Sequence, residues 1–289
     1  MQPVRVQTKA DIREILETAG MRPHRRFGQN FLIDGNLLRK LVERAEIGPA
    51  DTVLEVGGGT GVLSDLLAAQ AGRLIIVELD HRLGPLLVER FADRDHVSVL
   101  LMDALSGKHY VAPEVLDTLG AAPPAGGIYT LVANLPYNIA TPLIMNLLRA
   151  RPQVQRMCFT IQKEVADRLV AAPGRKDYGV VSVAVQTVCR VEHVANVPHT
   201  AFWPMPKVQS TMLRLDRQAH PFEADAALEA FIDLLKAGFS HRRKTLRYNL
   251  ARGYSADLVD RLAGHTDLTR RAENLSVPEW TALAKLLTS

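Results

Sequence analysis

Four consecutive residues, Asn134-Leu135-Pro136-Tyr137, combine groups that could activate and hold a planar amine. The exocyclic amine of adenine is a poor nucleophile because its lone pair is delocalised into the ring, and two acceptors on its hydrogens would free that lone pair. The Asn134 side-chain oxygen could be one acceptor and the Leu135 carbonyl the other. Pro136 stiffens the turn, and Tyr137 offers a face for base stacking. The same residues alone would also fit an ordinary turn after a strand.

A glycine-rich turn, Gly57-Gly58-Gly59-Thr60-Gly61, could receive a cofactor that contains a nucleoside. Glycine lets the backbone take a positive φ and approach a ligand closely. A dinucleotide site would require G-x-G-x-x-G, but Val62 stands where the third glycine would fall. The spacing therefore favours S-adenosylmethionine, with Gly57 and Gly59 at the ligand. A structural turn without a ligand is the alternative.

Two acids follow the next two expected strands, Glu78 and Asp103. Glu78 could accept both ribose hydroxyls, which supports a nucleoside without identifying it. Asp103 could accept the amino group of a cofactor adenine, or it could cap a helix over 104–109. Carboxyl ends of parallel strands meet at one edge of a sheet, so Gly57, Glu78, Asp103 and Asn134 are expected to form a ring around one crevice. The methyl group of S-adenosylmethionine is already activated, so positioning would do most of the work there.

An alternation of strands and helices must position these residues. We expect strands over 52–56, 73–77, 97–102, 128–133 and 157–162, and helices over 34–46, 62–71, 81–92, 141–150 and 163–172. This order predicts a parallel sheet with helices on both faces. The remaining expectations are a short amphipathic helix over 8–19, a surface connection over 105–127, and two long strands over 179–190 and 207–215.

The last part of the chain has a purely helical pattern from Pro221 onward. We therefore predict an α/β domain over 1–218, which includes a helical and basic N-terminal segment over 1–33. A small all-helical domain is predicted over 219–289.

Composition adds a few limits. The 289 residues are 47% hydrophobic and carry a formal net charge of +4. No apolar run approaches the roughly 18–20 residues that span a bilayer, and no secretory signal is visible. Cys158 and Cys189 lie in apolar stretches without nearby metal-type partners, which favours buried thiols in a reducing cytoplasm over a disulfide or metal site. We expect a cytoplasmic monomer.

Positive charge is concentrated in two clusters. The first contains Arg22, Arg25 and Arg26, and the second contains Arg242, Arg243, Lys244 and Arg247. Either could bind phosphates of RNA, and either could be an ordinary solvated surface.

From about Arg25 to Trp280 the chain resembles the rRNA adenine N6,N6-dimethyltransferase family. The matching segments are 26–32, the glycine turn, 77–80, Asp103-Ala104, 134–139, 162–165, 202–208 and 242–245. The resemblance implies a Rossmann-like class I methyltransferase fold, with a mostly parallel seven-stranded sheet and S-adenosylmethionine as cofactor. It places Asn30 and Leu32 at the methionine end of that cofactor, Gly57, Glu78, Asp103 and Asn134 in its pocket, and Phe202 as a second aromatic wall for the target adenine.

The product that this resemblance implies is a pair of adjacent dimethyladenosines in a hairpin near the 3′ end of small-subunit (16S) rRNA. The implied partner is that rRNA or a precursor of the small ribosomal subunit, and the helical domain over 219–289 would contact the RNA or the ribosome. Two positions depart from the family pattern: Gly58 stands where members often have proline, and Met102 stands where relatives often have a small or polar residue.

Three other functions share some of these features. A large-subunit rRNA adenine methyltransferase shares the first domain, but segments 202–208 and 242–245 favour the small-subunit family. DNA adenine methylation would require a target-recognition domain, and none is visible. A ribosome-assembly factor that mainly binds would not need the intact set of Asn134, Tyr137, Glu78 and Asp103.

Overall fold

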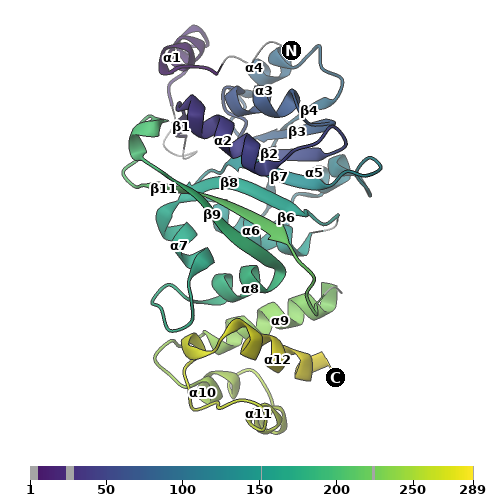
Figure 1. Cartoon of the computed structure of the whole chain (residues 1–289), viewed down its shortest axis with the longest axis vertical. Coiled ribbons are helices and arrows are strands. Elements are labelled where there is room, and N and C mark those ends of the chain that lie inside the picture. The colour runs from purple at the N-terminus through teal and green to yellow at the C-terminus, as the bar shows by residue number, and fades with distance from the viewer. Residues whose placement is uncertain (1–5, 24–28, 151, 223–224, 289) are drawn as a thin grey trace. The chain divides into compact units, whose positions relative to one another are not determined.

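The computed structural model describes the chain except residues 1–5, 24–28, 151, 223–224 and 289. The described residues pack as two compact units (Figure 1). One is formed within Met1–Ala166 and Glu192–Asp216, and the other within Asp167–Val191 and Arg217–Ser289. No helix among the described residues is long and apolar enough to cross a membrane.

The first unit is built on the seven-stranded sheet that carries the candidate site. Its strands stand in the order β4-β3-β2-β7-β8-β11-β9. Neighbours from β4 to β8 are parallel, and β11 runs antiparallel to β8. The bounds are β2 Thr52–Val56, β3 Arg73–Glu78, β4 Val97–Leu101, β7 Tyr129–Asn134, β8 Arg156–Gln162, β9 Cys189–Val197 and β11 Ser210–Arg217. The predicted fold class is confirmed.

Helices fill the connections between these strands, as the apolar periodicity predicts. They are α2 Gly35–Ala45, α3 Val62–Ala68, α4 Gly84–Arg90, α5 Pro113–Leu119, α6 Ala140–Arg149 and α7 Lys163–Val170. Helix α2 begins at Asp34, whose side chain accepts from the backbone N–H groups of Asn36 and Leu37. Aspartate is one of the residues that most often cap the start of a helix in this way. Every residue of β2 is buried, as befits a central parallel strand covered on both faces.

Residues 179–190 do not form the long strand predicted from their valine content. Most of them form helix α8, Val180–Val188, and strand β9 begins only at Cys189. The helix is buried on most of its surface, and it packs on α9 (Asp225–Gly238) and α12 (Val277–Thr288). The Ser182 hydroxyl accepts from the Gly179 N–H at its first turn. Burial on nearly all sides removes helical periodicity, so β-branched composition misled the prediction.

The segment 105–127 is also more ordered than the predicted surface connection. It holds a two-stranded hairpin, β5 Leu105–Ser106 with β6 Tyr110–Val111, and then helix α5. Val115 and Leu119 of α5 are buried. Pro113 occupies the first helical turn, where its missing N–H costs nothing. The glycines and prolines after α5 explain why the whole stretch suggested a loop.

The second unit is helical, with α9, α10 Leu246–Leu250, α11 Ala256–Ala263, the short helix η3 Ala272–Asn274 and α12. Phe222 stacks on Phe231, and Phe239 on Trp280, at ring-centre distances of 4.4 and 5.4 Å. The helical character predicted from Pro221 onward is confirmed. Asp167–Val191, which the sequence prediction assigned to the first domain, packs with these helices. A division at 218/219 between independently folding domains stays a prediction.

A short N-terminal element completes the first unit. Helix α1, Lys9–Thr18, begins at Thr8 and buries Ile12 and Leu16 in a cluster with Phe31 and Leu83. Strand β1, Phe31–Leu32, pairs antiparallel with β10, Phe202–Trp203, which follows the short helix η2, His199–Ala201. Residues 29–32 are thereby held beside the carboxyl ends of the parallel strands.

Candidate functional site

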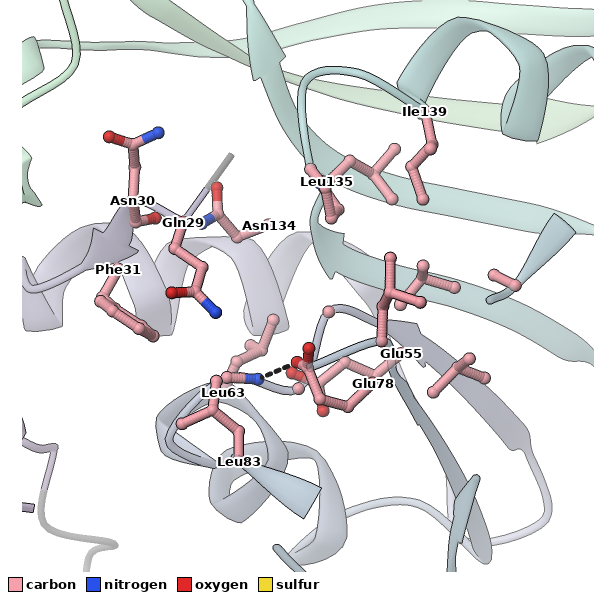
Figure 2. Close-up of a pocket in the computed structure, with 18 of the residues that line it drawn as sticks. Gln29, Asn30, Phe31, Glu55, Leu63, Glu78, Leu83, Asn134, Leu135 and Ile139 are labelled. Carbon is pink, nitrogen blue, oxygen red and sulfur yellow. Dashed lines mark hydrogen bonds between the residues drawn. The ribbon is translucent and has the colours of Figure 1, made fainter. Parts of the chain in front are cut away.

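A cavity opens where the parallel strands of the first unit end. It encloses about 970 Å³ of space, the open solvent at its mouth included. Figure 2 shows Gln29, Asn30 and Phe31 approaching it from one side, and Glu55 and Glu78 from another. All seven predicted cofactor residues line it: Asn30, Leu32, Gly57, Gly59, Glu78, Asp103 and Asn134.

The glycine turn makes close contacts with two other predicted segments. Gly57 has a φ of +88°, and a Cβ built there would lie 3.2 Å from a Pro136 ring carbon. Gly59 has a φ of +57°, and its Cβ would lie 3.2 Å from the Phe31 ring. Both positions therefore require glycine for backbone conformation and for close approach. The turn, the Asn134–Tyr137 segment and strand β1 form one packed frame around the cavity.

Glu78 presents a carboxylate that the backbone fixes in place. Its Oε2 accepts from the Gly59 N–H at 2.8 Å, and its Oε1 accepts from the Asp80 N–H at 2.8 Å. Burial raises the pKa of this carboxyl, and the two N–H donors act in the opposite direction. Each oxygen retains further acceptor capacity, so the group can hold two hydroxyls of a ligand in a defined orientation.

Asp80 supports the same wall by anchoring Gln29. The Gln29 side chain donates to Asp80 Oδ2 at 2.8 Å, while Arg82 donates to both Asp80 oxygens. The Arg82 hydrogen bonds lower the pKa of Asp80 to about 2. Asp80 is thus a structural acid.

Asn134 ends β7 with its amide held in one orientation. Its Nδ2 donates to the Asn30 carbonyl oxygen at 2.9 Å, which identifies the nitrogen end because a carbonyl can only accept. Its Oδ1 is buried and has no hydrogen-bond partner among the described residues. A buried acceptor without a partner is costly in a folded protein. A ligand in the cavity that donates an N–H to Asn134 would remove that cost.

Tyr137 lies just beyond, half-buried, with its hydroxyl 2.7 Å from the Ser210 Oγ at the start of β11. Burial raises the pKa of the Tyr137 hydroxyl, so the hydroxyl stays protonated at neutral pH. The sequence indicates a role for Tyr137 but contains no signal for Ser210. Ser210 enters the site only because β11 pairs with β8, opposite Gln162.

Phe202 and Asp103 differ in where they lie. Phe202 is only 3% exposed, lies opposite Leu32 in the β1–β10 pair and does not line the cavity. Its role as a second aromatic wall stays a prediction.

Asp103 is exposed at the cavity, and its Oδ1 accepts from the Leu105 N–H. No helix follows Asp103, because 105–106 form strand β5.

Glu55 is the main residue that the sequence analysis missed. It lies two positions before Gly57, lines the cavity and is 1% exposed. Its Oε2 has no hydrogen-bond partner among the described residues. Burial, and to a smaller extent the charge of Glu78, raises the pKa of Glu55 well above its usual value. A single acid within an apolar strand is rare in a core, and that signal could have identified it.

The Glu55→Gln variant is expected to change how stability depends on pH. The folded chain keeps the Glu55 proton above the ordinary pKa of 4.5, so it binds more protons than the unfolded chain there. The stability contributed by Glu55 is therefore fully present below that pH and is lost as pH rises toward the raised folded pKa. Glutamine carries no such proton. The free energy of unfolding of the variant, relative to that of the wild type, should therefore be higher at about pH 8 than at about pH 5, as measured by urea unfolding. A difference in stability between variant and wild type that does not change with pH would contradict this.

The two departures from the family pattern have different surroundings. A Cβ at Gly58 would lie 2.4 Å from a methyl group of the buried Ile76, so this chain fills with Ile76 the space that a larger residue would need. Met102 lines the cavity beside Asp103. Neither departure removes a predicted cofactor residue from the cavity.

The predicted RNA-binding residues differ in whether they are paired with an acidic residue. Arg25 and Arg26 lie outside the described residues, and Arg22 is exposed. In the second unit, Arg242 pairs with Glu273 at 2.7 Å and Arg247 with Asp260 at 2.9 Å. Arg243 and Lys244 are exposed and form no ion pair within the described chain. No cluster that could hold a metal ion occurs among the described residues.

Comparison with known proteins agrees with this geometry. The model of the ribosomal RNA adenine dimethylase family matches residues 20–289. A protein of Geobacillus kaustophilus named ribosomal RNA small subunit methyltransferase A is 37% identical over 98% of this chain and 97% of its own length. The protein of the same name from Moorella thermoacetica is 38% identical over 94% and 95%.

Two solved structures are also similar. A dimethyladenosine transferase from Plasmodium falciparum matches with a TM-score of 0.69 and 26% identity, over 86% of this chain and 94% of that one. The 23S rRNA methyltransferase ErmE matches with a TM-score of 0.65 and 26% identity, over 90% and 100%. The chain belongs to the ribosomal RNA adenine dimethylase family, whose members are methyltransferases.

Proposed function

We propose that this member of the ribosomal RNA adenine dimethylase family methylates N6 of two adjacent adenosines in a hairpin near the 3′ end of small-subunit rRNA. The methyl donor would be S-adenosylmethionine and the product a pair of dimethyladenosines. One observation carries the proposal: Asn134 holds its amide nitrogen on Asn30 and leaves a buried, unpartnered oxygen at a cavity that a nucleoside can enter.

The residues around the cavity fit S-adenosylmethionine, which supplies an activated methyl group. Glu78 would accept the ribose hydroxyls and Asp103 the adenine amino group, while Asn30 and Leu32 would contact the methionine portion. Gly57 and Gly59 leave space that a Cβ would fill. The absence of a third dinucleotide glycine, with Val62 at that position, also favours this cofactor over NAD.

Asn134 would act on the target amine rather than as a strong base. Its Oδ1 accepts one N6 hydrogen, and the Leu135 carbonyl accepts the other, which returns the lone pair to nitrogen for attack on the methyl carbon. Formation of the C–N bond would break the S–CH3 bond of the sulfonium, whose electron pair stays on sulfur as S-adenosylhomocysteine leaves. The positive charge that develops on nitrogen would be stabilised by the same two acceptors until a proton passes to water. Tyr137 would stack on the base, which must first leave its helical stack.

Several basic residues are proposed to hold the RNA. Arg22, Arg25 and Arg26 precede the site segment in sequence. Arg243 and Lys244 carry positive charge that no described acid neutralises, whereas Arg242 and Arg247 would have to exchange their acidic partners for phosphates. The cytoplasm suits such a substrate, and two buried cysteines that are not joined in a disulfide, Cys158 and Cys189, fit a reducing compartment.

The small-subunit substrate is preferred to the large-subunit one because of the relatives. Those named for the small subunit reach 37–38% identity over nearly whole chains, whereas the large-subunit enzyme reaches 26%. A purely binding role in ribosome assembly is less favoured, because the acceptor and cofactor residues are all retained at the cavity.

The deciding experiment offers labelled S-adenosylmethionine with under-methylated small subunits, with large subunits and with DNA, and then maps the product. We expect two labelled, adjacent adenosines in small-subunit rRNA only. Label confined to large-subunit rRNA would establish the alternative, and no label on any substrate would leave the binding role.

The hydrogen bond between Tyr137 and Ser210 predicts coupled effects. Ser210→Ala and Tyr137→Phe each remove the same bond, which is worth about 1 kcal/mol. Each is therefore expected to lower kcat/KM roughly 3- to 10-fold. The double variant should be no worse than either single variant, and Ser210→Thr should retain activity. Effects that multiply would mean that Ser210 does not act through Tyr137.

A further inference from the structure

An exposed tyrosine lies among cations on the surface of the helical unit. Tyr248 belongs to α10 and is 42% exposed. Lys244 Nζ lies 5.3 Å and Arg252 Cζ 5.9 Å from the centre of its ring. The His241 ring stands edge-on to it at 5.9 Å. We call Tyr248 with Lys244, Arg252 and His241 the Tyr248 platform.

The charges around this platform are not neutralised. Lys244 and Arg252 are exposed and form no ion pair with any described acid. Their neighbours Arg242 and Arg247, by contrast, are paired with Glu273 and Asp260. The basic cluster over 242–247 therefore contains two neutralised arginines and two cations without a described acidic partner, Arg243 and Lys244. Of these two, Lys244 lies at the tyrosine, together with Arg252. Unneutralised cations beside an aromatic face suit a nucleotide, which offers both a phosphate and a π-surface.

Helix α10, which carries Tyr248, is fixed by buried side chains and hydrogen bonds. Leu246 and Leu250, on the same short helix, are buried, and the Asn249 side chain donates to the backbone oxygens of Gly238 and His241. The Thr245 hydroxyl accepts from the Tyr248 N–H. A ring held this way loses little conformational freedom when a base stacks on it. A contribution to folding alone would not require the ring to remain exposed.

We propose that Tyr248 stacks on an unpaired base of the RNA substrate while Lys244 and Arg252 bind the phosphates beside that nucleotide. The proposal rests on the proposed function in taking RNA as the ligand. It adds a contact by residues of the helical unit that are not among the proposed methyl-transfer residues. An unpaired nucleotide is favoured over a duplex because a base inside a helix has no free face for the ring.

Direct binding tests the platform without requiring methyl transfer. Binding of the full chain is measured to a labelled 12-nucleotide single strand of mixed sequence, to its duplex, and to under-methylated small subunits. Tyr248→Ala is expected to weaken binding to the single strand and to small subunits about 5- to 100-fold, with the duplex nearly unaffected. Tyr248→Phe should bind like the wild type. Lys244→Ala and Arg252→Ala should each reduce the salt dependence by about one unit of slope.

Matched controls separate stacking from other effects. Tyr110→Ala removes a tyrosine that is 69% exposed on the hairpin of the other unit, and it should leave binding unchanged. Unchanged thermal unfolding and cofactor binding in Tyr248→Ala would exclude misfolding. The proposal would be overturned if wild type and Tyr248→Ala bound the single strand and the small subunits with equal affinity, or if neither protein bound them detectably. It would also be overturned if Tyr248→Ala lost as much affinity for the duplex as for the single strand. If methylation of small subunits failed while the single-strand effect held, only the proposed function would fall.

Discussion

Replacing Asn134 by alanine is expected to lower kcat for methyl transfer about 100- to 1,000-fold, the effect of losing one preorganised group that acts on the reacting atoms. The substitution removes the unpartnered Oδ1, which we assign to an N6 hydrogen of the target adenine. It also removes a hydrogen bond to Asn30, so binding of S-adenosylmethionine should weaken modestly. Single-turnover transfer to under-methylated small subunits measures the chemical step directly.

Two further variants make this result interpretable. Asn134→Asp keeps an acceptor but loses the donor to the Asn30 carbonyl, and it brings a charge into a buried position, so it should not restore activity. Asn36→Ala removes an exposed asparagine side chain at the start of α2 and should keep full activity. If Asn134→Ala transferred methyl groups at the wild-type rate, the proposed acceptor would be wrong even if the family substrate were right.

Replacing Glu78 by alanine is expected to raise the dissociation constant for S-adenosylmethionine about 10- to 100-fold, because hydrogen bonds to a charged group contribute roughly 1.5–3 kcal/mol. The same change leaves the Gly59 and Asp80 N–H groups without their acceptor, so the free energy of unfolding should fall by about 1–3 kcal/mol. Glu78→Gln retains one acceptor oxygen and should give intermediate values for both. Isothermal titration with the cofactor and urea unfolding measure the two effects separately.

The control for Glu78 is Glu89→Ala, which removes an exposed glutamate side chain from α4 of the same unit. It should change neither cofactor affinity nor stability beyond a few tenths of a kcal/mol, as is usual for exposed positions. Unaltered cofactor affinity in Glu78→Ala would rule out a ribose contact, whatever the loss of stability. A loss of affinity without a loss of stability would mean that the backbone hydrogen bonds contribute little.

Much of the α/β unit could be predicted because its signals are local. Strand Thr52–Val56 is a short apolar run bounded by turn residues, and α2 follows a capping Asp34, so burial and capping both act within a few residues. For residues 180–188 the same kind of local signal gave the wrong prediction. Their valines match a strand locally, and only the helices α9 and α12 packed around them make a helix more favourable. Helix α5 was missed because the glycines and prolines that follow it made the whole segment 105–127 resemble a surface loop.

The candidate site was likewise predictable in part from the sequence. Gly57, Glu78, Asp103 and Asn134 could be brought together from the sequence, because each follows an expected strand and parallel strands end at one edge. The chemical type of each side chain and its place at a strand end were therefore determined by the sequence alone. Positive charge at 242–247 was equally visible, but not which of those cations had acidic partners.

Only the tertiary structure decided which atoms remain available. The Asn134 oxygen is unpartnered because β1, more than a hundred residues earlier, brings the Asn30 carbonyl to the amide nitrogen. Ser210 reaches Tyr137 through antiparallel pairing of β11, and burial by surrounding strands raises the pKa of Glu55. Hydrogen bonding and desolvation depend on distances between segments far apart in the chain. A linear pattern specifies the groups but not these distances, and the distances determine which groups can meet a ligand.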